Sequence, residues 1–216
     1  ANICIGTTTT LTASATGTWS ANNPLIATIN SLTGVVTGVA EGIATFRFTS
    51  SDGCVSQNSG IVTVSPKPIT VLNGPNSICV GKTTNISPTS GGTWQSTDIA
   101  VATISNAGLI TGVSAGTARF IFTNTGTGCI SDTSVVVTIT QGPTVAITGD
   151  DELCIGETTT LSPSSGGTWA SNSPLIAGVT NGGVVTALSA GQATFTFTDA
   201  AGCKSDPTLP VIVHPK

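Results

Sequence analysis

The chain has 216 residues, of which only 7% are charged, and its formal net charge at pH 7 is −4. Globular proteins usually carry about 25% charged residues, so Ser, Thr, Asn and Gly must supply most of this polar surface. The six Lys and Arg residues form no basic patch in the sequence, which excludes nucleic acid as a partner. No apolar run reaches the roughly 18 residues of a membrane helix, so we expect no membrane insertion.

One sequence pattern occurs three times in the chain. The equivalent residues are 74 or 75 positions apart: Cys4, Cys79 and Cys154; Trp19, Trp94 and Trp169; Cys54, Cys129 and Cys203. A period of this length lets each unit hold its own small core. The repeat therefore predicts three domains, residues 1–67, 68–142 and 143–216, called copy 1, copy 2 and copy 3 below. Because no Met and no signal-peptide pattern is present, we expect a piece of a longer chain.

Short strands are predicted throughout each copy. In copy 2 they cover residues 69–72, 83–87, 93–96, 101–104, 109–113, 120–122 and 135–139. These segments are rich in β-branched residues and are bounded by Gly, Pro and Asn, the pattern of strands and turns. No stretch has helical periodicity. The sequence therefore predicts an all-β fold.

The aromatic residues recur in register and are predicted to form the cores. Two Phe residues that are two positions apart face the same side of a strand, and one Trp per copy suits the main buried aromatic of a sandwich. A stacking platform for sugar rings is the alternative for the Trp residues. The predicted core residues are Trp19, Trp94, Trp169, Phe46, Phe48, Phe120, Phe122, Phe195 and Phe197.

Short links join the copies. Pro66-Lys67-Pro68 and Gln141-Gly142-Pro143 are too short and too stiff to act as flexible tethers. Three copies placed end to end would form a semi-rigid rod on the order of 100 Å long.

Copy 1 has no counterpart of the strand at residues 69–72, because Ala1 aligns with Asn76. A boundary in the sequence explains this simply. The alternative is complementation of copy 1 by a strand from another chain.

Several motifs resemble the bacterial immunoglobulin-like domains of the second group. They are Gly81-Lys82-Thr83-Thr84, Thr93-Trp94-Gln95-Ser96, Val101-Ala102-Thr103-Ile104, Gly108-Leu109-Ile110-Thr111-Gly112 and Ala115-Gly116-Thr117-Ala118. The cysteine positions also resemble Ig-like repeats of very large secreted proteins of Bacteroidota. The resemblance implies three tandem Ig-like β-sandwich domains arranged end to end, as in surface adhesins and secreted proteins. It is specific for the fold and weak for a ligand.

The six cysteines indicate an oxidising, extracytoplasmic setting. Pairing within each copy is the most economical arrangement: Cys4–Cys54, Cys79–Cys129 and Cys154–Cys203. Each bridge would close a loop of about 50 residues. In the chain-entropy model, such a loop stabilises the folded state by roughly 4 kcal/mol. Six cysteines allow other connectivities. A metal site is a further alternative, although the wide spacing lacks the paired pattern of zinc ligands.

Other candidate sites are few. Asp150-Asp151-Glu152 is a weak calcium candidate, expected at the junction of copies 2 and 3, where oxygen ligands would suit the ion; a solvated turn is the alternative. The single His214 lies beside Pro215 with no nucleophile or paired carboxylate in the pattern of an active site. We therefore expect no enzyme activity and no cofactor.

The leading functional prediction is a segment of a long bacterial surface adhesin or filament that provides reach and attachment, with gliding or biofilm adhesion as specific possibilities. Its expected partners are neighbouring repeats, surface glycans or like filaments, at the cell surface or outside the cell. The alternative is a spacer or carbohydrate-binding region of a secreted polysaccharide-degrading enzyme, whose catalytic domain would carry paired carboxylates.

Overall fold

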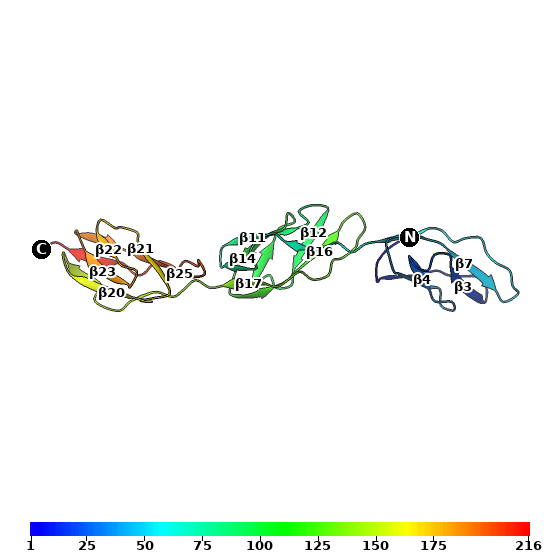
Figure 1. Ribbon diagram of the computed structural model, residues 1–216, viewed down its shortest axis with the longest axis horizontal. Helices are drawn as coiled ribbons and strands as arrows, with labels where there is room; N and C mark the ends of the chain where they lie inside the picture. Colours follow the sequence, from blue (N-terminus) through cyan, green and yellow to red (C-terminus); the bar gives the residue numbers. More distant parts are fainter.

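The computed structural model describes all residues 1–216 and consists of strands and connecting loops, without a helix. Three β-sandwiches follow one another end to end, and copy 2 lies between the other two (Figure 1). Each sandwich has its own buried apolar cluster. The predicted all-β fold, with Ig-like sandwiches arranged as a rod, is confirmed.

The strands recur in the same order in the three copies. Copy 1 contains β1 (Asn2–Cys4), β2 (Thr8–Thr10), β3 (Gly17–Ala21), β4 (Ala27–Ile29), β5 (Val35–Gly38), β6 (Gly42–Ala44), β7 (Phe46–Ser50) and β8 (Val62–Ser65). Copy 2 contains β9 (Val71–Leu72), β10 (Ser77–Cys79), β11 (Thr83–Ser87), β12 (Gly92–Ser96), β13 (Ala102–Ile104), β14 (Leu109–Gly112), β15 (Gly116–Ala118), β16 (Phe120–Asn124) and β17 (Val137–Thr140). Copy 3 contains β18 (Ala146–Ile147), β19 (Glu152–Cys154), β20 (Thr158–Ser162), β21 (Gly167–Ser171), β22 (Ala177–Val179), β23 (Val184–Ala187), β24 (Gly191–Ala193), β25 (Phe195–Asp199) and β26 (Val211–His214).

Copy 2 shows the complete arrangement. One sheet has the order β13-β14-β11-β9, a second has the order β10-β17-β15, and β12 pairs with β16. All of these pairs are antiparallel except β10 with β17, in which Cys79 lies opposite Thr140. Because β17 is the last strand of the copy, this parallel pair carries Cys79 to the end where the chain leaves for copy 3.

The motif Gly-Thr-Trp is explained by packing under an aromatic ring. A Cβ on Gly92 would collide with the ring of Phe122 and with the carbonyl of Thr123, and Gly17 and Gly167 stand in the same position. The Trp two residues later packs on the same Phe, with ring centroids 5.1 Å apart in each copy. Glycine is therefore required for the close approach of the two paired strands.

The aromatic residues lie inside the sandwiches, with one difference among the copies. Trp94 and Trp169 are each 6% exposed, and Phe46, Phe120, Phe122, Phe195 and Phe197 are fully buried. Trp19 and Phe48 of copy 1 are only half-buried. The indole of Trp94 donates a hydrogen bond to the carbonyl of Pro88 at 2.9 Å, and Trp169 bonds Pro163 in the same way.

Copy 1 lacks one edge strand. Its sheet has three strands in the order β2-β5-β4, whereas β9 and β18 add a fourth strand to the equivalent sheets. Leu72 of β9 pairs with Ile86, which is fully buried. Leu11 occupies the position of Ile86 in copy 1 and is half-buried. The missing strand thus uncovers core residues of copy 1.

This difference gives a matched pair of substitutions. We expect Ile86→Ala to destabilise copy 2 by about 2–5 kcal/mol, because it leaves a cavity in a closed core. Leu11→Ala should cost less than about 2 kcal/mol, because solvent already reaches this site. Backbone hydrogen exchange resolved by copy would measure both effects, and equal costs at the two positions would contradict the structural difference.

Candidate functional site: the junctions between copies

The first cysteine of each copy lies at the end that faces the following copy. Cys4 of β1 is in parallel register with Ser65 of β8, the last residue before the linker. Cys154 is likewise in register with His214 near the end of copy 3. We call this end the C-terminal pole of a copy.

The second cysteine of each copy lies at the opposite end, the N-terminal pole. Cys54 and Cys129 follow the turns after β7 and β16, the strands that pair with β3 and β12. The turn is closed by the backbone N–H of Asn124, which donates to the carbonyl of Cys129 at 2.9 Å. In Figure 1, β7 points away from copy 2 toward the outer end of the rod.

The disulfides consequently join neighbouring copies. Cys4 bonds Cys129, and Cys79 bonds Cys203, each with a Cα–Cα distance of 5.5 Å. Cys54 and Cys154 are free and exposed. Each bridge runs from the first cysteine of one copy to the second cysteine of the next.

The predicted pairs Cys4–Cys54, Cys79–Cys129 and Cys154–Cys203 are therefore wrong. The two cysteines of copy 2 bond to different neighbours, Cys79 to copy 3 and Cys129 to copy 1, so they lie at opposite ends of the sandwich. A disulfide requires Cα atoms about 4.4–6.8 Å apart, and the two poles are separated by the length of the sandwich. The number of residues between two cysteines does not reveal at which end of the sandwich each one lies.

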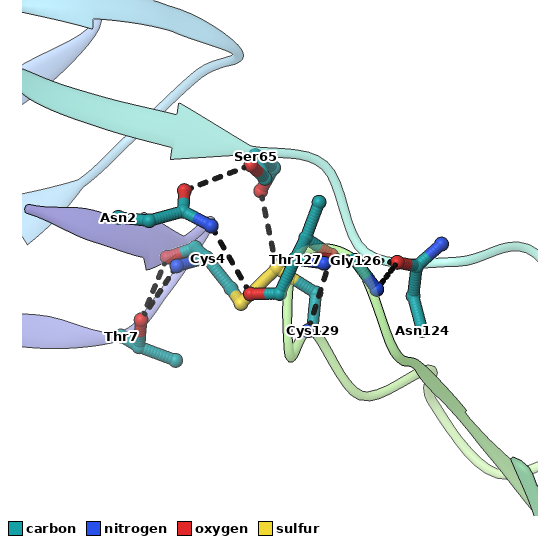
Figure 2. Close-up of a disulfide and its surroundings, with 8 residues drawn as sticks. All are labelled: Asn2, Cys4, Thr7, Ser65, Asn124, Gly126, Thr127 and Cys129. Atoms are coloured by element: carbon teal, nitrogen blue, oxygen red, sulfur yellow. Dashed lines mark hydrogen bonds between the residues drawn. A yellow bond between two sulfur atoms is a disulfide. The ribbon is translucent and has the colours of Figure 1, made fainter. Parts of the chain in front are cut away.

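Polar contacts surround the first junction (Figure 2). The amide of Asn2 donates to the carbonyl of Thr127 at 3.1 Å, a direct bond from copy 1 to copy 2. The hydroxyl of Ser65 donates to the side-chain oxygen of Asn2 at 3.0 Å. Cys129 is fully buried, with its sulfur 3.9 Å from the carbonyl of Ser65. The bridge is thus enclosed by the linker and by both poles.

The linkers also rest on the following copy. The ammonium of Lys67 forms an ion pair with Asp132 at 2.7 Å. At the second junction, Gly142 replaces this lysine and lies so close to the carbonyl of Lys204 that a Cβ would collide with it. A cavity of about 370 Å³ there is lined by Cys79, Lys82 and Asp206, among others. Each linker is therefore held along a segment that follows the second cysteine.

A serine pattern after the second cysteine, which is not among the residues predicted from the sequence, fixes that segment. The backbone N–H groups of Phe122 and Phe120 donate to the hydroxyls of Ser131 and Ser134, at 2.9 and 3.0 Å. Ser205 and Thr208 do the same in copy 3, and Ser56 and Ser59 in copy 1. The backbone N–H of each of these Ser and Thr residues also donates to the carbonyl of the same Phe, so the segment is bonded to the strand in both directions. The signal was the spacing Cys-x-Ser-x-x-Ser/Thr, which occurs three times.

The acidic cluster does not lie at the junction expected for it. Glu152 belongs to β19, which pairs with the last strand β26 toward the C-terminal pole of copy 3. Asp150, Asp151 and Glu152 are all exposed, and a carboxylate oxygen of Glu152 is 3.3 Å from Nε2 of His214. No group of three or more His, Cys, Asp or Glu residues is arranged to hold a metal ion.

An open groove is the largest hollow of copy 1. It has a volume of about 660 Å³ and lies where copies 2 and 3 have their additional edge strand. Its lining includes Leu11, Trp19, Phe48 and the free Cys54. Apolar core side chains and a thiol thus meet in one exposed site.

The comparison with protein families matches residues 59–128 to the bacterial Ig-like domain (group 2). The resemblance inferred from the sequence motifs is confirmed over that stretch. This is a family of Ig-like domains, and no catalytic family is indicated. None of the curated proteins matches the chain, and the structure has no helix with the length and apolar character needed to cross a membrane.

The solved structures that match this chain have low sequence identity to it. Bacteroides ovatus SGBP-B of a mixed-linkage glucan utilization locus, in complex with a mixed-linkage heptasaccharide, is 15% identical over 99% of this chain and 66% of that chain, with a TM-score of 0.26. Invasin, a bacterial integrin-binding protein, is 14% identical over 95% of this chain and 53% of that chain, with a TM-score of 0.40. Surface layer protein SbsC, domains 1–6, is 14% identical over 98% of this chain and 40% of that chain, with a TM-score of 0.27. The chain spans 66% or less of these three proteins, and likeness at this level says nothing about ligands.

The disulfide pattern predicts the distribution of thiols. Alkylation of the unfolded but unreduced protein should label Cys54 and Cys154 only, because the other four cysteines are bonded. Peptide mapping by mass spectrometry would locate the labels. Pairing within copies would instead leave no thiol to label.

A cleavage experiment provides an independent control. A protease site inserted between Lys67 and Pro68 should leave the two fragments joined until reductant is added, because Cys4–Cys129 spans the cut. Separation without reductant would contradict the bridge between copies 1 and 2.

Proposed function

We propose that this chain is a non-enzymatic segment of a long bacterial surface protein, an adhesin or filament that provides reach and attachment outside the cell. The observation that carries the proposal is the double covalent connection at each junction. A linker and a disulfide both join copy 1 to copy 2, and a second such pair joins copy 2 to copy 3. Residues 1–67, 68–142 and 143–216 are the proposed domains of this rod.

Two connections restrict motion that one linker would permit. A single linker acts as a pivot for bending and rotation, whereas a bridge beside it limits both. The contacts of Lys67 with Asp132 and of Asn2 with Thr127 act in the same direction, although exposed ion pairs are worth only about 0–1 kcal/mol each. The covalent pair is therefore the main support for stiffness.

The setting follows from the cysteines. Disulfides persist in oxidising surroundings outside the cytoplasm, and two of them hold this rod together. The surface, with 7% charged residues, offers hydroxyls and scattered apolar side chains in place of charges. These properties support a cell-surface or secreted location and contacts with glycans or with like filaments.

One exposed apolar feature recurs along the rod and suits attachment. Leu25, Ile99 and Leu175 are 80, 73 and 84% exposed, and they lie in the turns before β4, β13 and β22. Val39, Val113 and Leu188 lie on the neighbouring loops, whose backbone bonds to this turn, and are also exposed. We call these six residues the apolar row. Weak contacts that repeat on a stiff array are multiplied when they act together.

Removal of one bridge tests the stiffness. The double substitution Cys4→Ser, Cys129→Ser should broaden the distribution of shapes and lower the mean radius of gyration, because the first junction retains only its linker. Small-angle X-ray scattering would measure the change. Cys54→Ser, which removes a free thiol, serves as the control and should leave the profile unchanged; an unchanged profile for the double variant would refute a stiffening role.

Substitution of the apolar row tests attachment. We expect the triple variant Leu25→Ser, Ile99→Ser, Leu175→Ser to lower retention on insoluble polysaccharides, host glycans or abiotic surfaces by about tenfold, because three weak contacts are lost together. Leu32→Ser, Ile43→Ser, Ile69→Ser removes other exposed apolar side chains, at positions where the other copies have no large apolar residue, and should have little effect. If the parent protein is not retained on any surface, the attachment role is refuted, and the chain acts as a spacer without adhesive contacts of its own.

A further inference from the structure

The groove of copy 1 corresponds to an occupied site in the other two copies. In copy 2, Leu72 and Val71 of β9 pair with Ile86 and Ser87 of β11. In copy 3, Ile147 and Ala146 of β18 pair with Leu161 and Ser162 of β20. Leu11 and Thr12 hold the same positions in copy 1 and have no strand beside them.

The occupant of the other two sites has a defined side-chain pattern. Leu72 is packed against the core cluster of copy 2, and Ile147 against that of copy 3. Val71, the neighbour of Leu72, is 52% exposed. The groove therefore requires an apolar residue at one position and tolerates a solvent-facing residue at the position before it.

The free thiol lies in the same groove. Cys54 lines it together with Leu11, Trp19 and Phe48. Its equivalent in copy 2, Cys129, is buried against the linker at Ser65 and bonded to Cys4 of the preceding copy. The serines that follow show the same difference: Ser131 and Ser134 are buried, whereas Ser56 is exposed and Ser59 half-buried.

The other free thiol lies at the opposite pole of the molecule. Cys154 is in register with His214, as Cys4 is with Ser65 and Cys79 with Thr140. Both of those equivalents bond to the second cysteine of the next copy. Cys154 therefore presents the same half of a bridge that Cys4 and Cys79 contribute.

We infer that Cys54 and the groove form an acceptor site for a further copy of this repeat on the N-terminal side of copy 1. The linker strand of that copy adds to the free edge of β2 and places an apolar side chain over Leu11, Trp19 and Phe48. Its first cysteine forms a disulfide with Cys54. Cys154 is the matching donor cysteine at the other pole. The array can therefore be continued in both directions by the same bond, from the first cysteine of one copy to the second cysteine of the next.

The bridge forms by thiol–disulfide exchange. Two thiols lose two protons and two electrons, and a small disulfide such as oxidised glutathione accepts both to give two reduced thiols. The docked poles bring the two sulfur atoms together, as they do for Cys4 and Cys129. This inference rests on the proposed function and extends it, because it explains how further copies are added to the rod. Its tests do not depend on retention on any surface.

A peptide tests the groove in the intact protein. The probe is a synthetic peptide with the sequence of residues 64–73, which contains β9 and the linker before it. We expect saturable binding that changes the fluorescence of Trp19 and slows alkylation of Cys54 by about tenfold or more, while alkylation of Cys154 is unaffected. Strand addition to a free sheet edge supplies the backbone hydrogen bonds.

Two altered peptides provide the matched controls. A Leu72→Asp peptide should bind at least about tenfold more weakly, because it puts a charge over the apolar groove. A Val71→Asp peptide should bind as the parent does, because this side chain faces solvent. Equal binding of the two altered peptides, or a response to simple sugars in place of the peptide, would overturn the assignment of the groove to a strand.

A pair of protein variants tests the bridge. Cys154→Ser leaves only the acceptor thiol, and Cys54→Ser leaves only the donor thiol. Mixed in a glutathione redox buffer, they should form a Cys54–Cys154 heterodimer in excess over the share expected from random pairing. Random pairing, or a preference for homodimers, would overturn the proposed bridge between Cys54 and the first cysteine of another copy. This holds whatever the result of the surface assays.

Discussion

The parallel pairing of the first cysteine-bearing strand with the last strand of the same copy determines how the whole array is joined. This pairing sets Cys4 beside Ser65 and Cys79 beside Thr140, at the pole from which the chain departs. The second cysteine follows an antiparallel strand that ends at the other pole. With one cysteine at each pole, a copy cannot close its own bridge, but it can bond to the copy before it and to the copy after it.

Copies 2 and 3 show what the linker strand from the preceding copy contributes to a sandwich. Where β9 and β18 are present, Ile86 and Leu161 are buried and the Trp indole bonds to a proline carbonyl. Where the strand is absent, Leu11, Trp19 and Phe48 are partly exposed, and Ala13 stands in place of the proline. The linker strand is therefore part of the core of the copy that follows it. Neighbouring copies are thus joined by the chain itself and by an apolar side chain of the linker that packs into the core of the following copy.

Much of the fold could be predicted from the sequence, because its determinants are local or repeated. The 75-residue period, the β-branched runs and the alternating Phe residues specify strands, their facing sides and the core aromatics. The cysteine pairing depends on long-range topology instead. A separation of 50 residues within a copy suggested Cys79–Cys129, and only the parallel register of β10 with β17 reveals that Cys79 faces copy 3. The position of Asp150 to Glu152 was misjudged for the same reason, since the strand that follows this cluster runs along the last strand of copy 3.

The covalent junctions also compensate for a surface that has little else to hold neighbours together. A protein with 7% charged residues can form few ion pairs between domains, and only one, Lys67 with Asp132, connects a linker to the next copy. The chain-entropy model assigns roughly 4 kcal/mol to a bridge within a copy and slightly more to one that spans 125 residues. The stabilisation is therefore similar in size, but it acts at a different place. A bridge within a copy would stabilise one sandwich and leave the linker as a pivot, whereas the observed bridge stabilises the relative position of two sandwiches, which is the property that a long rod requires.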